Sequence, residues 1–182
     1  MIRAVFLDRD GVINEDRDDY VKNLAELRVF ENAPEAIRRL NDAEFEVFVV
    51  SNQQGVARGI VSQEDLRAIQ DEIVRRVSSA GGRIAGFYYC THLAQEGCSC
   101  RKPQPGLILR AAREHKIDLA QSVMIGDSEK DVLAGKSAGC GTVLVLSGFL
   151  TRDDAANIAC GPDFVARDLS EAADHVLKLQ KH

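Results

Sequence analysis

Two aspartates near the start of the chain, Asp8 and Asp10, have the residue types and spacing that most directly suggest chemistry. They follow a short apolar run. If extended backbone continues through them, both carboxylates point to one side while Arg9 points to the other. Two carboxylates held close together need a compensating cation or a shared proton. One could then attack a substrate while the other carries protons, although an isolated Asp-x-Asp is commonly a capped turn or a solvated loop.

Ser51, Lys102 and Asp127 supply the groups that such a carboxylate pair would need. A carboxylate nucleophile suits phosphoryl transfer through an aspartyl-phosphate, but its charge repels a phosphate dianion unless Mg²⁺ and a lysine offset the repulsion. Each of the three residues follows a predicted strand or precedes a predicted helix. Taken jointly, they predict a magnesium-dependent site for phosphoryl transfer.

Four potential zinc ligands crowd into one short segment: Cys90, His92, Cys98 and Cys100. Three thiolates and one imidazole make a tetrahedral set with no position left for substrate, which predicts a structural Zn²⁺ in a loop of about residues 90–103. The spacing differs from the usual Cys-x-x-Cys knuckle, so unligated thiols are the alternative. Cys140 and Cys160 stand apart and are interpreted as small buried thiols.

Arg101 and Lys102 directly follow the last cysteine, so a metal that clamped the loop would fix both cations over a bound phosphate. Residues 103–106, Pro-Gln-Pro-Gly, then open a helix whose free backbone N–H groups would point to the same place. A rigid proline-rich turn is the alternative. Arg101 is predicted to contact the substrate, against the alternative of a solvated surface arginine.

The elements that must position these residues are short apolar runs that alternate with helical patterns. Strands are predicted at 4–7, 46–50, 86–89, 123–125 and 142–146, with a short extended piece at 164–165 and helices at 34–42, 62–80, 105–115, 130–138 and 170–179. We therefore predict an α/β fold, a Rossmann-like three-layer α/β/α sandwich with a mainly parallel sheet. Residues 1–182 are expected to form one domain without a large cap, which leaves the active site open at the carboxyl ends of the strands.

Composition narrows the classes of protein. The 182 residues are 45% hydrophobic and 28% charged, which argues against a disordered chain, a collagen-like chain or a disulfide scaffold. With 23 Lys+Arg against 28 Asp+Glu, the net charge is −5, which argues against nucleic acid or an anionic membrane as the main partner. No apolar run resembles a signal peptide or a bilayer span. We expect a cytoplasmic monomer that acts on a small molecule.

The sequence resembles the haloacid dehalogenase (HAD) superfamily of aspartate-nucleophile phosphatases, whose four motifs match Asp8-Arg9-Asp10-Gly11, Ser51-Asn52, Lys102 and Gly126-Asp127. The resemblance implies that Asp8 is the nucleophile and Asp10 the general acid and base. It implies that Ser51 and Lys102 bind the transferring phosphoryl group. The carboxylates of Asp8 and Asp127, with the backbone carbonyl of Asp10, would hold Mg²⁺.

Asp131 is a further candidate ligand for that Mg²⁺, because it falls one turn into the helix after Asp127. An acid at a helix start that is stabilised by the helix dipole is the alternative interpretation. The acidic loop of residues 16–19 is interpreted mainly as solvated, and any contacts that it makes with substrate stay open.

A Cys-x-His and Cys-x-Cys loop that runs into Arg-Lys-Pro is similar to one branch of this superfamily, the heptose-bisphosphate and histidinol-phosphate phosphatases. Segment 51–59, Ser-Asn-Gln-Gln-Gly-Val-Ala-Arg-Gly, is close to the heptose form. The resemblance therefore implies removal of the 7-phosphate of D-glycero-D-manno-heptose 1,7-bisphosphate. The residues implied to contact this substrate are Asn52, Gln53, Gln54, Arg58 and Arg101, with Lys102.

Two other functions stay open at this point. The short gap between His92 and Cys98 also occurs in histidinol-phosphate phosphatases, which makes that activity the first alternative. The second is a non-catalytic, zinc-bound module that binds phosphate in the same acidic pocket. The intact set of motif residues argues against a non-catalytic protein.

Overall fold

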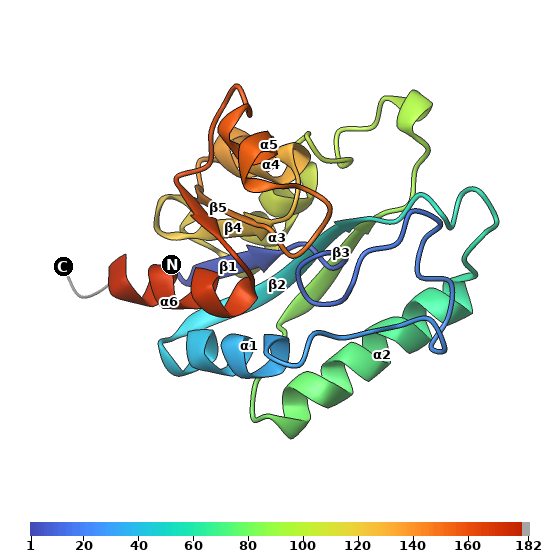
Figure 1. Cartoon of the computed structure of the whole chain (residues 1–182), viewed down its shortest axis with the longest axis horizontal. Helices are drawn as coiled ribbons and strands as arrows, with labels where there is room; N and C mark the ends of the chain where they lie inside the picture. Colours follow the sequence, from blue (N-terminus) through green and yellow to red (C-terminus); the bar gives the residue numbers. More distant parts are fainter. Residues whose placement is uncertain (180–182) are drawn as a thin grey trace.

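The computed structural model describes residues 1–179, which contain a six-stranded sheet with parallel pairing throughout. The strands are β1 (Arg3–Leu7), β2 (Phe45–Asn52), β3 (Gly86–Cys90), β4 (Val123–Gly126), β5 (Gly141–Val145) and β6 (Phe164–Ala166). Their order across the sheet is β3-β2-β1-β4-β5-β6, so the chain moves outward from β1 in both directions (Figure 1). In such sheets a crevice opens where the order reverses, here between the carboxyl ends of β1 and β4.

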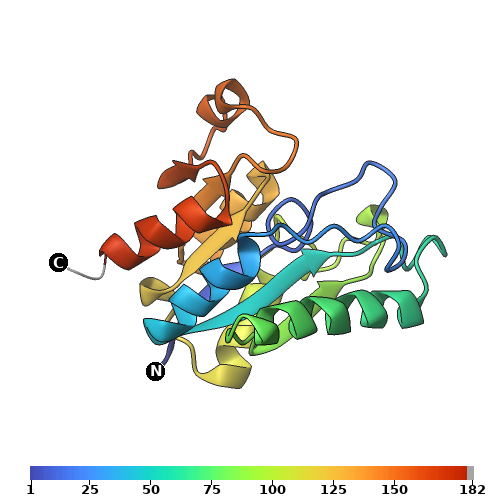
Figure 2. The same cartoon turned by 60° about the horizontal axis from the view of Figure 1, so that its bottom comes forward.

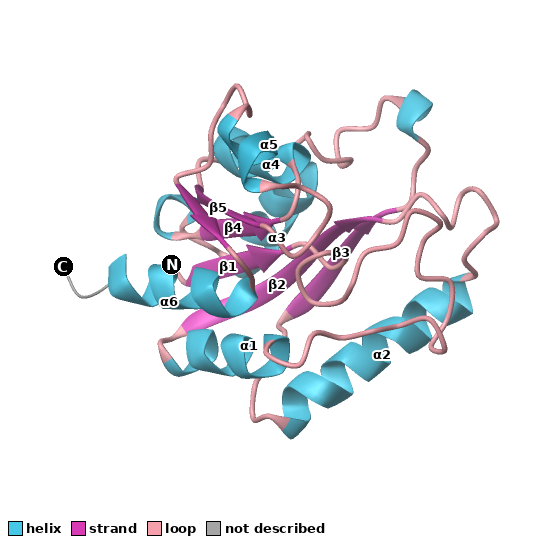
Figure 3. Ribbon diagram, in the orientation of Figure 1, coloured by secondary structure: helices cyan, strands magenta, loops and turns pink. Residues whose placement is uncertain are grey.

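Helices cover both faces of this sheet. They are α1 (Ala33–Asp42), α2 (Gln63–Ser79), α3 (Gly106–His115), α4 (Glu129–Ala138), α5 (Arg152–Ala156) and α6 (Leu169–Leu179). Figures 1 and 2 show α1, α2 and α6 on one face and α3 and α4 on the other. The predicted three-layer α/β/α sandwich is confirmed. The chain links connecting strands to helices gather at the carboxyl ends of the strands, where Figure 3 draws long loops.

The strands read as continuous apolar runs because both of their faces are buried. In β1, Val5 and Leu7 belong to the core beneath α1, α2 and α6, whereas Ala4 and Phe6 belong to the core beneath α3 and α4. All four are fully buried. This alternation follows from the two-residue period of a strand. It holds β1 rigidly in the centre of the sheet, which fixes the residue that follows it.

The predicted elements are confirmed, with shifts at their ends. β2 continues through Ser51 and Asn52, which were expected after the strand, because these residues pair in register with Tyr89 and Cys90 of β3. The short helix α5 was not predicted, since its sequence of five residues carries no clear periodic signal. The helix that was predicted from residue 105 begins at Gly106, with Pro105 as the N-cap of α3.

Two other expectations concern the surface. Cys140 is buried as predicted, but Cys160 is exposed, because it lies in the irregular segment after α5 and outside the packed layers. Among residues 1–179, none of the helices combines the length and the apolar character that crossing a membrane requires.

Candidate active site

The first site residue, Asp8, lies directly after β1 at the reversal of strand order. Its backbone N–H donates to the carbonyl of Ile125 in β4 at 3.0 Å, so the ladder between the two central strands extends to this residue. Its Oδ1 atom accepts a hydrogen bond from the backbone N–H of Arg9 at 2.7 Å. The side chain is 14% exposed, so the carboxylate is firmly placed and still reachable from outside.

Lys102 is buried against this carboxylate, with a side chain that is 3% exposed. Its Nζ atom lies 2.9 Å from Oδ2 of Asp8 and 2.6 Å from Oδ1 of Asp131, and it donates to the carbonyl of Val50 at 2.9 Å. Burial lowers the pKa of Lys102, but Asp131 and Asp8 outweigh burial and leave the pKa above its usual range. The lysine is therefore an ammonium ion, as a phosphate-binding residue requires.

Asn52 holds the backbone of this lysine in place. The Asn52 side chain donates from Nδ2 to the Lys102 carbonyl at 3.1 Å and accepts at Oδ1 from the Lys102 N–H at 3.0 Å. The side-chain amide thus forms the two hydrogen bonds that the backbone of a neighbouring β-strand would form with Lys102. This pairing joins the end of β2 to the segment that carries Arg101 and Lys102.

Three carboxylates converge beside Lys102. Asp8, Asp127 and Asp131 each place one oxygen within 4.8 Å of the oxygens of the other two. Burial raises the pKa of Asp127 to about 9, and the charges of Asp8 and Asp131 add to the rise. Burial likewise raises the pKa of Asp8 to about 6, against the opposing effect of Lys102. One ammonium does not balance three carboxylates, so this oxygen donor set fits a hard divalent cation such as Mg²⁺.

Glycines make room for the central carboxylate of this cluster. A Cβ atom at Gly148 would lie 2.0 Å from Oδ2 of Asp127, and one at Gly11 would lie 2.2 Å from the same atom. Gly11 also has a φ of +77°, a backbone conformation that glycine adopts without strain. Neither position tolerates a side chain while Asp127 keeps its present place.

Asp131 takes the helix-start role that was expected as one alternative, and its role as an Mg²⁺ ligand stays a prediction. It belongs to the carboxylate cluster, and its Oδ2 atom also accepts hydrogen bonds from the Ser128 N–H at 3.1 Å and the Ser128 hydroxyl at 2.6 Å. These two residues form the capping box at the start of α4. The helix start thereby fixes the orientation of Asp131 toward Lys102.

Three residues donate hydrogen bonds to the carboxylate of Asp10, which is not a member of this cluster. Arg9 donates to it from Nε and Nη2 at 2.9–3.0 Å, Asn14 donates from Nδ2 at 2.8 Å, and Gln53 donates from Nε2 at 2.9 Å. The expectation that Arg9 points away from both carboxylates was wrong. The strand ends at Leu7, so its alternation does not extend to these residues, and the long Arg9 side chain reaches the Asp10 carboxylate.

The site residues surround an open cavity of about 460 Å³. The predicted residues that line it are Asp8, Asp10, Ser51, Asn52, Gln54, Arg101, Lys102 and Asp127. Two predicted substrate contacts do not line it: Gln53 is buried beneath the cavity floor, and Arg58 is exposed on the loop after β2. Arg58 belongs to segment 51–59, which resembles the heptose form of the family. Its side chain is nevertheless exposed and lies outside the cavity lining.

Several lining residues were not predicted as site residues, namely Asp16, Arg17, Asp18, Tyr20, Ser128, Lys130, Phe149 and Leu150. Lys130 carries a usable signal, since it follows Asp127 by three residues in the first turn of α4. Tyr20 has a φ of +69°, and its hydroxyl accepts a hydrogen bond from Gln54 at 3.0 Å. This contact joins the acidic loop to the segment after β2, which spacing alone does not reveal.

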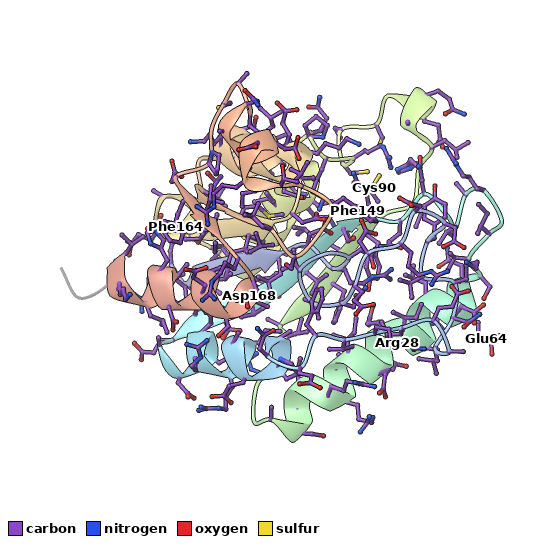
Figure 4. All side chains as sticks on the ribbon, viewed as in Figure 1. Arg28, Glu64, Cys90, Phe149, Phe164 and Asp168 are labelled. Atoms are coloured by element: carbon purple, nitrogen blue, oxygen red, sulfur yellow. The ribbon has the colours of Figure 1, made fainter. Side chains whose placement is uncertain are left out.

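The four cysteine and histidine ligands come together as predicted. Sγ of Cys100 lies 3.2 Å from Sγ of Cys90 and 3.4 Å from Sγ of Cys98, and Nδ1 of His92 lies 3.2 Å from Sγ of Cys100. These sulfur distances exceed the roughly 2.05 Å of a disulfide and approach the edge of a tetrahedron with metal bonds of about 2.3 Å. The donor set fits Zn²⁺. Figure 4 labels Cys90, the last residue of β3, at the start of this loop.

Comparisons with known proteins agree with this geometry. A family model described as HAD-hydrolase-like matches residues 99–172. A relative from Bordetella bronchiseptica named D-glycero-beta-D-manno-heptose-1,7-bisphosphate 7-phosphatase is 36% identical over 177 residues, covering 97% of this chain and 99% of the relative. A Pseudomonas aeruginosa relative of the same name is 40% identical over 144 residues, covering 79% of this chain and 81% of the relative.

Solved structures show the same likeness. The crystal structure of D,D-heptose 1,7-bisphosphate phosphatase from B. bronchiseptica, complexed with magnesium and phosphate, superposes with a TM-score of 0.90 at 35% identity, covering 98% of this chain and 99% of that one. The Burkholderia thailandensis enzyme of that name gives a TM-score of 0.71 at 30% identity, with coverages of 96% and 98%. The chain therefore belongs to the heptose 1,7-bisphosphate 7-phosphatase family of HAD-like phosphatases.

Proposed function

We propose that this protein is an Mg²⁺-dependent phosphatase that removes the 7-phosphate of D-glycero-D-manno-heptose 1,7-bisphosphate. The observation that carries the proposal is the carboxylate of Asp8, which faces an open cavity with Lys102 at 2.9 Å and two further acids beside it. Family relatives named for this reaction support the choice of substrate. The names of both relatives specify the β anomer, which we expect this protein to prefer.

The reaction starts with attack of an Asp8 carboxylate oxygen on phosphorus. The P–O bond to the sugar breaks as the new P–O bond to Asp8 forms, and Asp10 gives a proton to the departing sugar oxygen. Lys102 and the Ser51 hydroxyl bind oxygens of the transferring group. Asp10, now a carboxylate, takes a proton from a water that attacks the phospho-aspartate, which releases inorganic phosphate and restores Asp8.

The metal assignments belong to the same proposal. Asp8 and Asp127, with the backbone carbonyl of Asp10, would hold Mg²⁺, and Asp131 is a further acid of the cluster. When bound, Mg²⁺ neutralises negative charge on the phosphoryl group and lets a carboxylate approach it. Zn²⁺ on Cys90, His92, Cys98 and Cys100 would be structural, since four protein ligands leave no open position.

Arg101 and Lys130 are the groups that we assign to the second phosphate. Both line the catalytic cavity and also an adjoining cavity of about 580 Å³ along the zinc loop. The Nη1 atom of Arg101 is buried and has no hydrogen-bond partner among residues 1–179. A free guanidinium donor beside a second cation is suited to a phosphate that lies away from the reacting one.

A cytoplasmic location and a monomeric state stay predictions from the sequence.

A substrate panel tests this proposal. We expect kcat/KM for the β anomer of heptose 1,7-bisphosphate to exceed that for histidinol phosphate by roughly a hundredfold or more, because loss of one charge-assisted contact alone costs about tenfold or more. The panel contains the α and β anomers of heptose 1,7-bisphosphate together with histidinol phosphate, all assayed at the same Mg²⁺ concentration. A preference for histidinol phosphate would overturn the proposed substrate while leaving the phosphatase chemistry in place.

A further inference from the structure

Gln53 is a buried polar residue that the mechanism above does not use. Gln53 is only 2% exposed, and it does not line the catalytic cavity. Its backbone N–H donates to the carbonyl of Cys90 at 2.7 Å, which ties it to the end of β3. The chain therefore places a buried amide directly beneath the site, outside the cavity that a substrate would enter.

The amide nitrogen of Gln53 bridges two residues that face the substrate. Nε2 lies 2.9 Å from Oδ2 of Asp10 and 3.1 Å from Oγ of Ser51. The structure places the nitrogen of the amide and not its oxygen toward Asp10, so the amide donates and Asp10 accepts. The same nitrogen carries a second hydrogen, and this hydrogen points to Ser51. Gln53 therefore donates to both neighbours at once.

This arrangement settles the direction of the Ser51 hydroxyl. A hydroxyl carries one donor hydrogen and can accept through its oxygen lone pairs. Within residues 1–179, Ser51 Oγ accepts from Gln53, and the structure shows no protein acceptor for the Ser51 hydrogen. That hydrogen is left for an oxygen in the cavity. Donors that are oriented before the substrate arrives need no reorganisation in the transition state.

Asp10 is positioned in the same way. Arg9 and Asn14, from the segment after β1, donate hydrogen bonds to the Asp10 carboxylate. Gln53, from the segment after β2, donates a further one. Of the three side chains that donate to Asp10, that of Gln53 also donates to the site residue Ser51. A change at Gln53 would thus loosen the acid–base group and the phosphate-binding hydroxyl together.

We infer that Gln53 is a positioning residue, which orients the Ser51 hydroxyl toward the transferring phosphoryl group and fixes the Asp10 carboxylate beside it. The inference rests on the proposed phosphatase function through the roles of Ser51 and Asp10. It does not depend on the identity of the sugar. It corrects the expectation that Gln53 contacts the substrate.

Two variants test the inference. Gln53→Met keeps the length of the side chain and removes both donors, while Gln53→Glu keeps its shape and replaces the donating nitrogen with an acceptor. We expect either change to lower kcat by roughly 10- to 100-fold, within the range seen when an oriented donor or acid–base group is lost. Gln121→Met, which removes an exposed amide at the opposite end of the sheet, is the matched control and should leave kcat unchanged.

Vanadate inhibition separates positioning from a merely structural role. Vanadate adopts the five-coordinate geometry of phosphoryl transfer, whereas inorganic phosphate resembles the product. For Gln53→Met we expect the inhibition constant of vanadate to rise at least tenfold, with that of phosphate changing less than about threefold. Equal weakening of both anions, or a kcat like that of Gln121→Met, would overturn the inference. So would failure of both Gln53 variants to fold, because Gln53 would then serve the fold itself.

All assays are run with p-nitrophenyl phosphate as well as heptose 1,7-bisphosphate. If the parent protein hydrolyses only the former, the sugar assignment fails while the test of Gln53 proceeds on that ester. If the parent protein hydrolyses both and the Gln53 variants match the control, the inference fails and the proposed function stands.

Discussion

The Nζ atom of Lys102 lies 2.9 Å from Oδ2 of Asp8, so the cation of the site is in contact with the carboxylate that we propose as nucleophile. Asp131 shares the same ammonium at 2.6 Å. Asp127, the third acid, has no ion-pair partner among residues 1–179 and is the member whose pKa burial and neighbouring acids raise to about 9. The site therefore holds more acidic groups than its one lysine can balance, and several measurable consequences follow from that imbalance.

Asp127→Asn should stabilise the metal-free protein at neutral pH. The folded state holds the Asp127 proton up to about pH 9, whereas the unfolded chain releases it near its ordinary value of 3.8. The free energy of unfolding of the parent should thus fall between these pH values, by at most about 1.4 kcal/mol per pH unit from this group. In the variant the fall should be smaller. Denaturant titrations in the presence of a chelator measure the slope.

Addition of Mg²⁺ supplies the control for that prediction. A cation that binds the ionised cluster should stabilise the parent more at pH 8 than at pH 5, because its ligands must be deprotonated. The stabilisation should be absent in Asp127→Asn. Identical pH slopes for the two metal-free proteins would contradict the raised pKa of Asp127.

Gly148→Ala should weaken Mg²⁺ binding without abolishing the fold. A methyl group there would lie 2.0 Å from Oδ2 of Asp127, so the carboxylate or its loop must move. Displacement of a ligand from its orientation typically costs about tenfold or more in metal affinity. Gly161→Ala is the matched change, since the nearest atom to its new methyl group is 3.9 Å away. Calorimetric titration with Mg²⁺ would count against the prediction if both variants bound as tightly as the parent.

Cys98→Ala should remove bound zinc and slow catalysis together. The cysteine cluster lies immediately before Arg101 and Lys102, so loss of the metal would loosen two cations of the site. We expect stoichiometric zinc in the parent by elemental analysis, none in the variant, and a fall in kcat/KM of about tenfold or more. Cys160→Ala, an exposed cysteine outside the cluster, is the control. A parent protein without zinc would end this prediction.

Arg101→Met should raise KM for the bisphosphate by about tenfold or more, the usual cost of one charge-assisted hydrogen bond. It should change KM for p-nitrophenyl phosphate much less, because that ester has no second phosphate. Arg58→Met tests the expectation from the sequence that Arg58 contacts the substrate, because Arg58 lies outside the cavity lining. Its kinetic constants should equal those of the parent. An effect of Arg58→Met that matched Arg101→Met would show that the loop after β2 reaches the substrate.

Much of the fold and two acids of the carboxylate cluster could be predicted from the sequence, because these two directly follow buried apolar runs. Asp8 follows β1 and Asp127 follows β4, and the carboxyl ends of parallel strands necessarily meet at one edge. The zinc ligands could likewise be predicted, since four donors within one short segment must be close together.

Side-chain direction was less predictable beyond the strand ends. Arg9 was expected to point away from Asp10 but binds it, because the chain leaves extended geometry after Leu7. Gln53 was assigned to the substrate, yet it turns under the cavity to meet Ser51, since β2 runs on farther than its apolar residues indicate. Contacts of this kind depend on how the chain bends after a strand, which a periodic pattern does not encode.

A crystal structure with Mg²⁺ and beryllium fluoride tests the central claim, nucleophilic attack by Asp8, most directly. Beryllium fluoride bonds to a carboxylate oxygen as a stable analogue of an aspartyl-phosphate. We predict beryllium bonded to a carboxylate oxygen of Asp8, with its fluorines facing Lys102 and the Ser51 hydroxyl. Beryllium bonded to any other residue, or a water molecule between Asp8 and the bound analogue, would contradict it.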